Sequence, residues 1–424
     1  MAMRTFLRLR VYDLQQFLLC MDRGDIAHAR AWYRRLLWRS LRTPKSKLKG
    51  VVKLMVWPLT SAVRSARAVR QFGPGVDREY RVGPWRQFLQ CWLVMAMHGM
   101  SSESYYKFRL FLPDRRAKAS QYLQHIEIQQ LWPHILRSVV ASGMVERLEN
   151  KIAFSQWCAT NGIPTVAEAV PANPSSADDR RGLESLVRGP SDLISKPVDS
   201  WCGIGVRRWL KAAAGTYRRD DGAVVTTDQM LSELTASRSP QILQARLSNH
   251  ASMQGLTLGG LCTVRLVTVA ERGHPPTVAV SVLRMPTGDS PADNFERGGL
   301  AIGVDPASGC VTGSAVSKSQ HLGVKSYSRH PDTGCQFEGV RLPYWSDAIA
   351  IALRAHSLVD LPFVGWDVAI VADGALLLEA NPSWCVELAQ MPTGIPLGHT
   401  AVALCLKQFM HEAHVSAARR SDLP

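Results

Sequence analysis

The pattern of hydrophobic and polar residues changes once along the chain, at about residue 145. The first 140 residues are rich in Leu, Arg, Gln, Trp and Met, with few β-branched residues and several prolines, which predicts a set of helices. From about residue 145, short runs of β-type residues appear instead. They cover residues 192–198, 241–247, 261–270, 276–284, 363–371 and 375–380, and helical patterns at 343–359 and 399–414 flank the last two. The pattern predicts an α+β protein with a helical N-terminal region.

The formal charge is concentrated in the helical region. The chain has 424 residues, with 50 Lys and Arg against 35 Asp and Glu, for a net charge of +15. Residues 1–120 contain 24 basic and 7 acidic residues (net +17), whereas the other 304 residues contain 26 and 28 (net −2). This distribution argues against nucleic-acid binding along the whole protein and predicts a roughly neutral body with a basic attachment.

Residues 45–70 combine Lys and Arg with apolar residues, and two interpretations are open. The segment is either a surface helix that contacts an anionic membrane or an acidic partner, or a helical subdomain that packs on the body with its cations solvated. We favour the second interpretation because residues 82–113 carry enough aromatic residues to form a core.

Cysteine usage and hydropathy bear on the compartment. The nine cysteines are scattered and form no CxxC pair, which indicates neither a zinc module nor a disulfide framework and suits a reducing cytoplasm. No apolar run approaches the roughly 18–20 residues of a membrane span, and the first residues do not read as a secretory signal. We expect a cytoplasmic protein, with peripheral contact at the inner membrane face under the first interpretation of residues 45–70.

The first segment with candidate chemistry follows the β-type run at 192–198. Lys196 leaves this strand, and a loop that contains Gly203 and Gly205 leads into a second strand. Glycines let backbone N–H groups approach phosphate oxygens, and lysine adds a point charge. The segment matches neither a Walker A nor a GxGxxG pattern. Taken alone, the segment is therefore by default a plain hairpin with a solvated lysine, and a phosphate-binding loop is the alternative.

The second segment is a hairpin predicted from the runs at 363–371 and 375–380. Glu379 and Asn381 are two residues apart and share one face of their strand. If Asp367 joins them on that face, two carboxylates and an amide oxygen come together, and these are ligands that Mg²⁺ prefers. A hairpin with exposed acids is the alternative, and the three leucines before Glu379 disfavour it.

The turn decides where Asp367 points. A two-residue turn would direct its side chain away from Glu379, whereas a three-residue turn over 372–374, with Gly374 in the left-handed conformation, places the two carboxylates opposite each other. In that register four apolar side chains form the other face: Val368, Ile370, Leu376 and Leu378.

The third segment centres on Arg265, in the middle of the run at 261–270. Alternation puts it on one face with Thr263, Val267 and Val269. A mid-strand arginine needs an anionic partner, which is a phosphate or a carboxylate of a ligand, or equally an internal salt bridge. Downstream, Asn294 offers another amide.

In this order the segments resemble the ATP-grasp superfamily, and more narrowly its sugar-transfer-associated branch, which is related to the α-L-glutamate ligases. The resemblance covers roughly residues 145–400, and no single motif decides it. The matching segments are Leu148-Glu-Asn-Lys151, Lys196-Pro-Val, Gly203-Ile-Gly205, Ile242-Leu-Gln244, Thr263-Val-Arg265, Asp293-Asn294, Gly298-Gly299, Gly365-Trp-Asp367 and Glu379-Ala-Asn381.

The resemblance implies an ATP-grasp fold, in which two α/β subdomains sandwich ATP. It divides the chain into a basic helical N-terminal domain over residues 1–140, a nucleotide-binding lid subdomain over 141–248 and a catalytic subdomain over 249–415.

The resemblance also implies contacts to ATP. Lys151 and Lys196 would contact the phosphates beneath a lid over 199–205, whose members include Ser200, Gly203 and Gly205. The backbone of the segment 242–247 would read adenine through Gln244, Ala245 and Leu247. Ala245 stands where many relatives carry Glu, so Gln244 would take over part of that contact.

For the metal and the reacting groups, the resemblance implies that Asp367 and Glu379 hold one Mg²⁺ and that Glu379 and Asn381 hold a second. Arg265 and Asn294 would face the γ-phosphate or the activated carboxylate, with Lys196 beside them.

The activity implied is that of an ATP-dependent carboxylate–amine ligase that forms an amide through an acylphosphate. Its partners would be carboxylate and amine substrates that are small molecules, peptides or saccharides, with no specific nucleic acid. Two alternatives are open: a phosphotransferase of the same fold, and a non-catalytic ATP-binding docking module. The presence of Asp367, Glu379 and Asn381 argues against the last.

Overall fold

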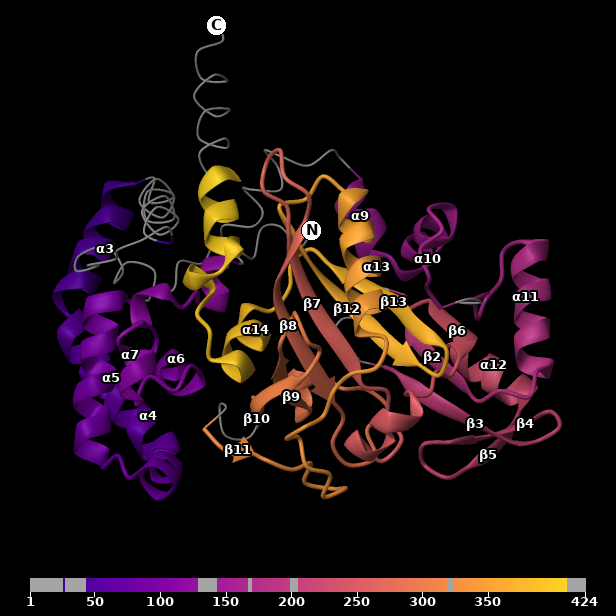
Figure 1. Ribbon diagram of the computed structural model, residues 1–424, viewed down its shortest axis with the longest axis horizontal. Coiled ribbons are helices and arrows are strands. Elements are labelled where there is room, and N and C mark those ends of the chain that lie inside the picture. Colours follow the sequence, from indigo (N-terminus) through magenta and orange to yellow (C-terminus); the bar gives the residue numbers. More distant parts are fainter. Residues whose placement is uncertain are drawn as a thin grey trace, which may run out of the picture.

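The computed structural model describes residue 26 and residues 43–128, 143–166, 170–198, 205–318 and 324–409. Three parts lie side by side in Figure 1: a layer of helices from the N-terminal region, a seven-stranded sheet in the middle, and a six-stranded sheet. Within the described residues, every helix is too short or too polar to cross a membrane.

The described part of the N-terminal region is helical, as its composition predicts. Proline lies in the first turn of α4, α5 and α7, where its missing N–H has no helical partner to lose. The elements are α3 (Pro44–Met55), α4 (Trp57–Tyr80), α5 (Pro84–His98), α6 (Ser102–Lys107), α7 (Pro113–Arg116) and η2 (Ala119–Gln121).

The six-stranded sheet is antiparallel throughout, in the order β1-β6-β2-β3-β4-β5. Helices α11 (Ala177–Arg188) and α12 (Thr227–Thr235) cover one face and form a separate apolar core with it. The strands are β1 (Val170–Pro171), β2 (Leu193–Pro197), β3 (Arg207–Ala213), β4 (Thr216–Arg219), β5 (Val224–Thr226) and β6 (Gln241–Ala245).

The seven-stranded sheet is also antiparallel, in the order β11-β10-β9-β8-β7-β12-β13. One face packs against α9 (Met144–Glu149), α10 (Lys151–Thr160) and α13 (Trp345–Ser357). The strands are β7 (Thr263–Val269), β8 (Thr277–Met285), β9 (Leu300–Val304), β10 (Val311–Ser317), β11 (Ser326–Tyr327), β12 (Phe363–Val371) and β13 (Gly374–Asn381). Short 3₁₀ turns lie at η3 (Ala251–Leu256), η4 (Phe295–Arg297) and η5 (Leu397–His399).

The other face of this sheet shares one core with the N-terminal helices. Valines of β7 and β8 pack there with α14 (Val386–Thr393), the helix at 401–409, and aromatic residues of the N-terminal region. Polar contacts join the same parts: Tyr122 donates from its hydroxyl to the carbonyl of Gly394 at 2.8 Å. The described N-terminal helices are therefore an integral layer of the molecule.

All six strands expected from the β-type runs are present, but several further strands were not predicted. Strands β4, β5, β9, β10 and β11 are short or contain small and polar residues, so their alternation is weak. The division of the chain into three domains stays a prediction. Helices α9 and α10, which that division grouped with the six-stranded sheet, pack against β13 of the seven-stranded sheet.

The hairpin of β12 and β13 has the predicted pairing by a different route. Asp367 lies opposite Glu379, as expected. However, the turn has two residues, 372 and 373, and Gly374 is the first residue of β13. A β-bulge between Asp367 and Val368 then shifts the register by one residue. The expected core face was wrong for β13, because Leu377 is buried and its neighbours Leu376 and Leu378 are only half-buried.

Candidate functional site

A buried ion pair lies at the centre of the face that carries Asp367. Arg265 on β7 lies directly opposite Asp367 on β12. Its Nε donates to Oδ1 of Asp367 at 2.5 Å, and its Nη2 donates to Oδ2 at 3.2 Å. Thus the mid-strand arginine has an internal carboxylate partner, and that carboxylate is one of the expected metal ligands.

Arg284 on β8 extends this cluster, and it was not singled out from the sequence. Its Nη2 lies 3.0 Å from Oδ2 of Asp367 and 3.5 Å from Oδ1 of Asp293, and its Nε donates to Oγ1 of Thr263 at 2.9 Å. Thr263 also bonds to Asp293. A signal was present in the sequence, because Arg284, like Arg265, interrupts a run of β-type residues.

The arginines keep Asp367 ionised although it is buried. Burial alone would raise the pKa of Asp367, but the charges of Arg265 and Arg284 and their hydrogen bonds outweigh it and lower the pKa below the usual range. For Asp293, burial dominates over Arg284 and raises the pKa. The cluster therefore offers one firmly negative carboxylate and one that protonates more readily.

Glu379 and Asn381 complete this face of the sheet. Asn381 donates from Nδ2 to Oδ2 of Asp367 at 3.4 Å. Glu379 Oε1 lies 3.6 Å from Nζ of Lys151, and the Glu379 side chain is 35% exposed. Lys151 also donates to the carbonyl of Val198 at 3.4 Å, so it connects β13 with the end of the six-stranded sheet.

Lys196 approaches the cluster from that second sheet. It is near the end of β2, opposite Ile242 on β6, on the face turned away from α11 and α12. Burial lowers the pKa of Lys196; the charge of Glu379 opposes this effect and that of Lys151 adds to it. Among the described residues, Lys196 has no carboxylate within ion-pair distance. Its ammonium is thus desolvated and lies within the field of the Glu379 carboxylate.

The segment expected to read adenine lies at the end of β6. Gln244 pairs with Ile194 and is buried, on the same face as Lys196, whereas Ala245 points to the opposite face. Leu247 follows the strand and is half-buried. Of the two strand residues expected to contact adenine, Gln244 is thus on the side of Lys196 and Ala245 is not.

Four of the expected site residues are not placed in the cluster by the described part of the chain. Ser200 and Gly203 lie outside the described residues, and Gly205 is at the edge of that gap, with a left-handed φ of 78°. Asn294 caps η4, where its Oδ1 accepts from the backbone N–H of Glu296 at 2.9 Å. The preceding residue, Asp293, is the one that reaches Arg284.

The two sheets are joined at a further point. Arg208 on β3 donates to both carboxylate oxygens of Asp289, at 2.8 and 2.7 Å, and from Nε to Asp220 at 2.7 Å. Asp289 belongs to the loop after β8. This bidentate pair ties the start of β3 to the loop that leads to Asp293.

The chemistry of three side chains fits Mg²⁺. Asp367, Glu379 and Asn381 present carboxylate and amide oxygens on one sheet face, and such hard oxygen ligands are the ones that Mg²⁺ takes. The Glu379 carboxylate is partly open to solvent. Oδ1 of Asp367 accepts one hydrogen bond, from Arg265, and a carboxylate oxygen has about two acceptor positions, so Oδ1 can take a further ligand.

Another acidic group, Glu296, Cys385 and Glu387, brings three ligand atoms close together. Lys318 forms ion pairs with both carboxylates, and Lys107 bonds to Glu387 at 2.9 Å. Ammonium groups therefore already neutralise this group, and it joins the helical layer to the sheet.

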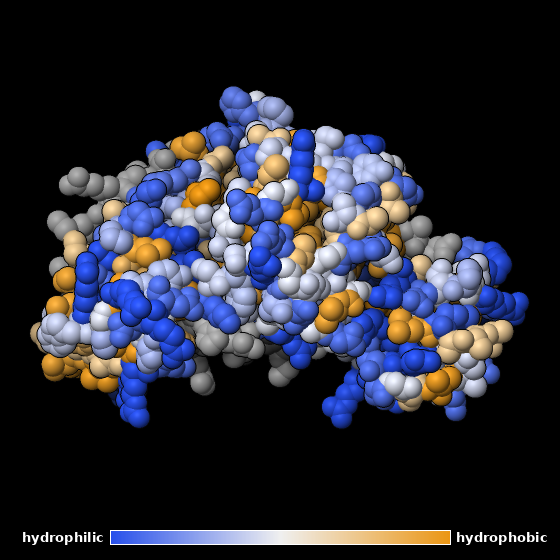
Figure 2. All heavy atoms as spheres, turned by 60° about the horizontal axis from the view of Figure 1, so that its bottom comes forward, coloured by the Kyte–Doolittle hydropathy of each residue, from blue (hydrophilic) through white to orange (hydrophobic). Residues whose placement is uncertain are grey.

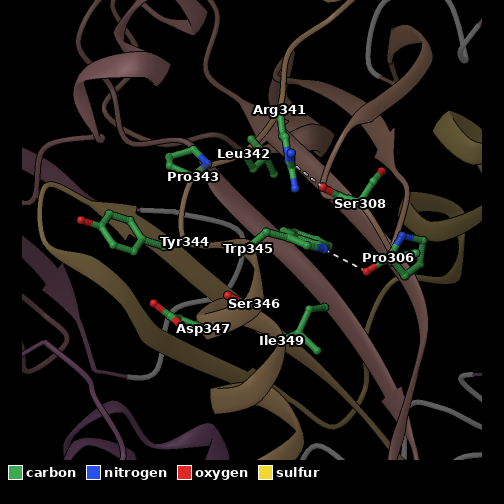
Figure 3. Close-up of a pocket in the computed structure, with 11 residues that line it drawn as sticks. Pro306, Ser308, Arg341, Leu342, Pro343, Tyr344, Trp345, Ser346, Asp347 and Ile349 are labelled. Carbon is green, nitrogen blue, oxygen red and sulfur yellow. Dashed lines mark hydrogen bonds between the residues drawn. The ribbon is translucent and has the colours of Figure 1, made fainter.

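A pocket of about 740 Å³ lies elsewhere, at the start of α13. In Figure 3, Trp345 donates from Nε1 to the carbonyl of Pro306, and Arg341 donates to the carbonyl of Ser308. None of the expected site residues lines this pocket. It is separate from the ion-paired cluster.

A protein-family model described as sugar-transfer associated ATP-grasp matches residues 136–405, which is more than half of the chain. The chain belongs to the sugar-transfer associated ATP-grasp family. This confirms the family and the ATP-grasp fold class expected from the ordered motifs, together with a helical N-terminal region. In this ATP-grasp protein the polar cluster falls within the matched residues. A comparison with curated proteins found no match.

Several solved structures are similar at low identity. N5-carboxyaminoimidazole synthase from Aspergillus clavatus matches with 11% identity over 62% of this chain and 51% of that chain, at a TM-score of 0.34. L-amino acid ligase from Bacillus licheniformis matches with 14% identity over 62% and 48%, at 0.36. D-alanyl-alanine synthetase A from Vibrio cholerae matches with 12% identity over 63% and 66%, also at 0.36. The chain spans about half the length of the first two proteins.

Proposed function

We propose that this ATP-grasp protein is an ATP-dependent carboxylate–amine ligase, which forms an amide bond through an acylphosphate. One observation carries the proposal: a single sheet face brings two carboxylates and an amide together with two guanidinium groups. Two lysines approach this face, Lys151 from α10 and Lys196 from β2 of the other sheet. A plain structural hairpin needs neither the second arginine nor the lysines.

The cations would serve the nucleotide. Lys151 and Lys196 would contact phosphate oxygens, and the lowered pKa of Lys196 reflects an ammonium that lacks solvent and gains most from an anion. Gln244, on the same face as Lys196, would contribute to base recognition. Asp367, Glu379 and Asn381 would hold Mg²⁺, which when bound neutralises charge on the transferring phosphoryl group.

The reaction would run in two steps. A substrate carboxylate oxygen attacks the γ-phosphorus of ATP, the bond to the β-phosphate oxygen breaks, and ADP leaves. The ammonium group of the second substrate gives one proton to solvent, and the neutral amine attacks the carbonyl carbon of the acylphosphate. The carbon–oxygen bond to phosphate then breaks, the nitrogen gives a second proton to the departing phosphate, and inorganic phosphate leaves as the amide forms. Arg265 and Arg284 would stabilise the negative charge that develops in both steps.

No side-chain nucleophile is required for this chemistry. Among the described cysteines, Cys91 and Cys158 are buried, and burial raises the pKa of each thiol to about 12, so neither supplies a thiolate near neutral pH.

Hydroxylamine trapping tests the proposal. The protein is incubated with Mg²⁺, ATP, hydroxylamine and a panel of amino acid and uronic acid carboxylates, and both ADP and hydroxamate are measured. A ligase gives hydroxamate with its carboxylate substrate, and Glu379→Gln abolishes it. The exposed Glu338, changed to Gln, serves as the matched control and leaves the yield unchanged.

The other two functions give different results. A phosphotransferase releases ADP with a hydroxyl acceptor and yields no hydroxamate with any carboxylate. A docking module binds ATP without turnover, and its nucleotide affinity is the only property that Glu379→Gln changes. Either result overturns the ligase proposal.

A further inference from the structure

The outer surface of the N-terminal helices is apolar. Of the 17 exposed large apolar side chains in the described residues, 11 belong to α3, α4, α5 and Val56 between them. Met55 is 76% exposed, Leu59 74% and Trp85 71%. We call this set the apolar face; its members are Leu48, Val51, Val52, Met55, Val56, Leu59, Val63, Trp85, Leu89, Leu93 and Met97.

The spacing of these residues forms stripes. On α5 they recur every four residues, from Trp85 to Met97, so they follow one side of the helix. Along α3 and α4 they recur at three or four residues from Leu48 to Val63. The stripe continues between the two helices, because Val56 donates to Val52 and Thr60 donates to Val56 through backbone hydrogen bonds of 3.1 Å.

The stripes lie on neighbouring helices. Gln87 bonds to the carbonyl of Gly73 at 3.1 Å, and Trp92 bonds to Ser61 at 3.0 Å, so α4 and α5 run antiparallel. The end of α5, with Leu93, is therefore beside the start of α4, with Leu59. Figure 2 shows apolar side chains gathered at the edge of the molecule that the helical layer forms.

Within residues 59–65 of α4, small polar residues lie inside and large apolar residues lie outside. Ser61 and Ser65 of α4 are fully buried, whereas Leu59 and Val63, only two residues away, are exposed. Exposed apolar areas of this kind mark a surface that contacts something else.

The surroundings of the apolar face are basic. No acidic residue occurs between Asp25 and Asp77. Lys45 and Lys49 on α3 and Arg67 on α4 are exposed. The segment 45–70 has seven basic residues and no acidic one; the basic residues are Lys45, Lys47, Lys49, Lys53, Arg64, Arg67 and Arg70. A ligand complementary to this surface would be both anionic and apolar.

We infer that the apolar face docks on an anionic lipid bilayer, with α3, α4 and α5 lying in the interface. Hydrocarbon would receive the apolar stripe, and acidic headgroups would receive the flanking cations, which is the combination that interfacial helices use. An acidic protein would match the charges but not an uninterrupted row of aliphatic side chains. Since the helical layer shares a core with the seven-stranded sheet, docking also fixes the candidate site relative to the membrane.

Vesicle sedimentation tests this inference. The full chain is mixed with vesicles of phosphatidylcholine alone, or of phosphatidylcholine with about one-third phosphatidylglycerol, at low and high salt. We expect binding only to the anionic vesicles, and weaker binding at high salt because surface charges are then screened. Leu59→Glu and Leu93→Glu each lower the partition coefficient about tenfold or more. A double Lys45→Glu, Lys49→Glu variant does the same.

Matched controls separate this surface from the rest of the molecule. Leu258, 56% exposed and outside the helical layer, is changed to Glu, and the exposed Arg218 on β4 is changed to Glu. Both variants bind vesicles like the parent chain, and melting curves check that all variants fold. The inference is overturned if the parent chain does not bind anionic vesicles, or if Leu59→Glu binds them as tightly as the parent chain does. It is equally overturned if light scattering shows a dimer that Leu59→Glu splits without any vesicle binding, since the face is then a self-interface.

Discussion

Asp367 and Arg265 lie opposite each other on adjacent strands, and their side chains are joined by hydrogen bonds of 2.5 and 3.2 Å. The pair is buried, with about 7% of each side chain exposed. A buried ion pair of this kind contributes little net stability, but the loss of one partner leaves a charge without compensation.

Asp367→Asn is expected to lower both the stability of the fold and the rate of turnover. It leaves Arg265 and Arg284 without their shared carboxylate, so we expect a loss of roughly 3–5 kcal/mol in the free energy of unfolding. Turnover falls by about a hundredfold or more, because the same oxygens are the proposed metal ligands. Urea unfolding and ADP release measure the two effects. Asp373→Asn, on the exposed turn of the same hairpin, changes neither.

Arg284→Lys tests the arginine that the sequence reading overlooked. Lysine keeps the charge, but all its N–H donors are on one nitrogen. It therefore cannot reproduce the contacts that Arg284 makes to Asp367 and Thr263 from two different nitrogens. We expect turnover to fall by about a hundredfold, with a smaller change in the dissociation constant for ATP. The exposed Arg297, changed to Lys, is the control. Unchanged turnover in Arg284→Lys would mean that the residue only balances charge.

The pairing of Asp367 with Glu379 was predictable because alternation along a hairpin leaves few registers. The bulge that produces the pairing was not, since a two-residue turn followed by one extra residue gives the same opposition as a three-residue turn. The sequence likewise placed Arg265 and Asp367 on strands. It did not reveal that the strands are neighbours, because β7 and β12 are almost a hundred residues apart.

Asn294 was expected at the site, but its neighbour Asp293 is the residue that contacts Arg284. Both are polar residues in one loop, and the sequence does not say which side chain turns inward. Asn294 satisfies the N–H of Glu296 in η4, a capping role that asparagine commonly takes, whereas Asp293 is buried beside Arg284.

The affinity for ATP is expected to depend on the protonation of Lys196. Burial lowers its pKa from the ordinary 10.5, so its ammonium loses the proton at a lower pH than an exposed lysine. Affinity should therefore be full at neutral pH and fall as the pH rises, before 10.5 is reached. Titration calorimetry over this range measures the slope. Lys196→Arg keeps its charge throughout and removes the slope; a slope that persists in this variant points to another group.

The free energy of unfolding is expected to fall in acid because of a buried histidine. His356 accepts at Nδ1 from Thr268 at 2.5 Å and donates at Nε2 to the carbonyl of Leu361 at 2.8 Å, while Trp366 donates to Thr268 at 2.8 Å. The imidazole is thus neutral, and burial lowers its pKa to about 4 from 6.5.

Acid destabilises the fold because His356 takes up a proton below pH 6.5 in the unfolded chain, but only below about pH 4 in the folded chain. The stability contribution is complete above pH 6.5 and declines as the pH falls through this window. Between pH 6.5 and 5 it should decline by about 2 kcal/mol. Urea unfolding at the two values measures the decline. It should shrink in His356→Gln and persist in His274→Gln, whose side chain is exposed.

The joint between the helical layer and the sheet rests on a buried glutamine. Gln390 on α14 accepts from the N–H of Leu123 and of Leu397, each at 3.0 Å, and donates to the carbonyl of Leu123 at 2.7 Å. Gln390→Leu has nearly the same volume but leaves these backbone groups buried without a partner. An unsatisfied buried group costs roughly 1–3 kcal/mol, so we expect a loss of about 3 kcal/mol or more in the free energy of unfolding.

Hydrogen exchange adds a spatial test of that prediction. Because Leu123 belongs to the N-terminal region and Gln390 to the C-terminal one, the amides of both segments should lose protection together in Gln390→Leu, while those of the six-stranded sheet keep theirs. The exposed Gln336, changed to Leu, serves as the control and leaves both stability and exchange as they are. If Gln390→Leu loosens only α14, the helical layer is held by its apolar core alone, and the polar joint is dispensable.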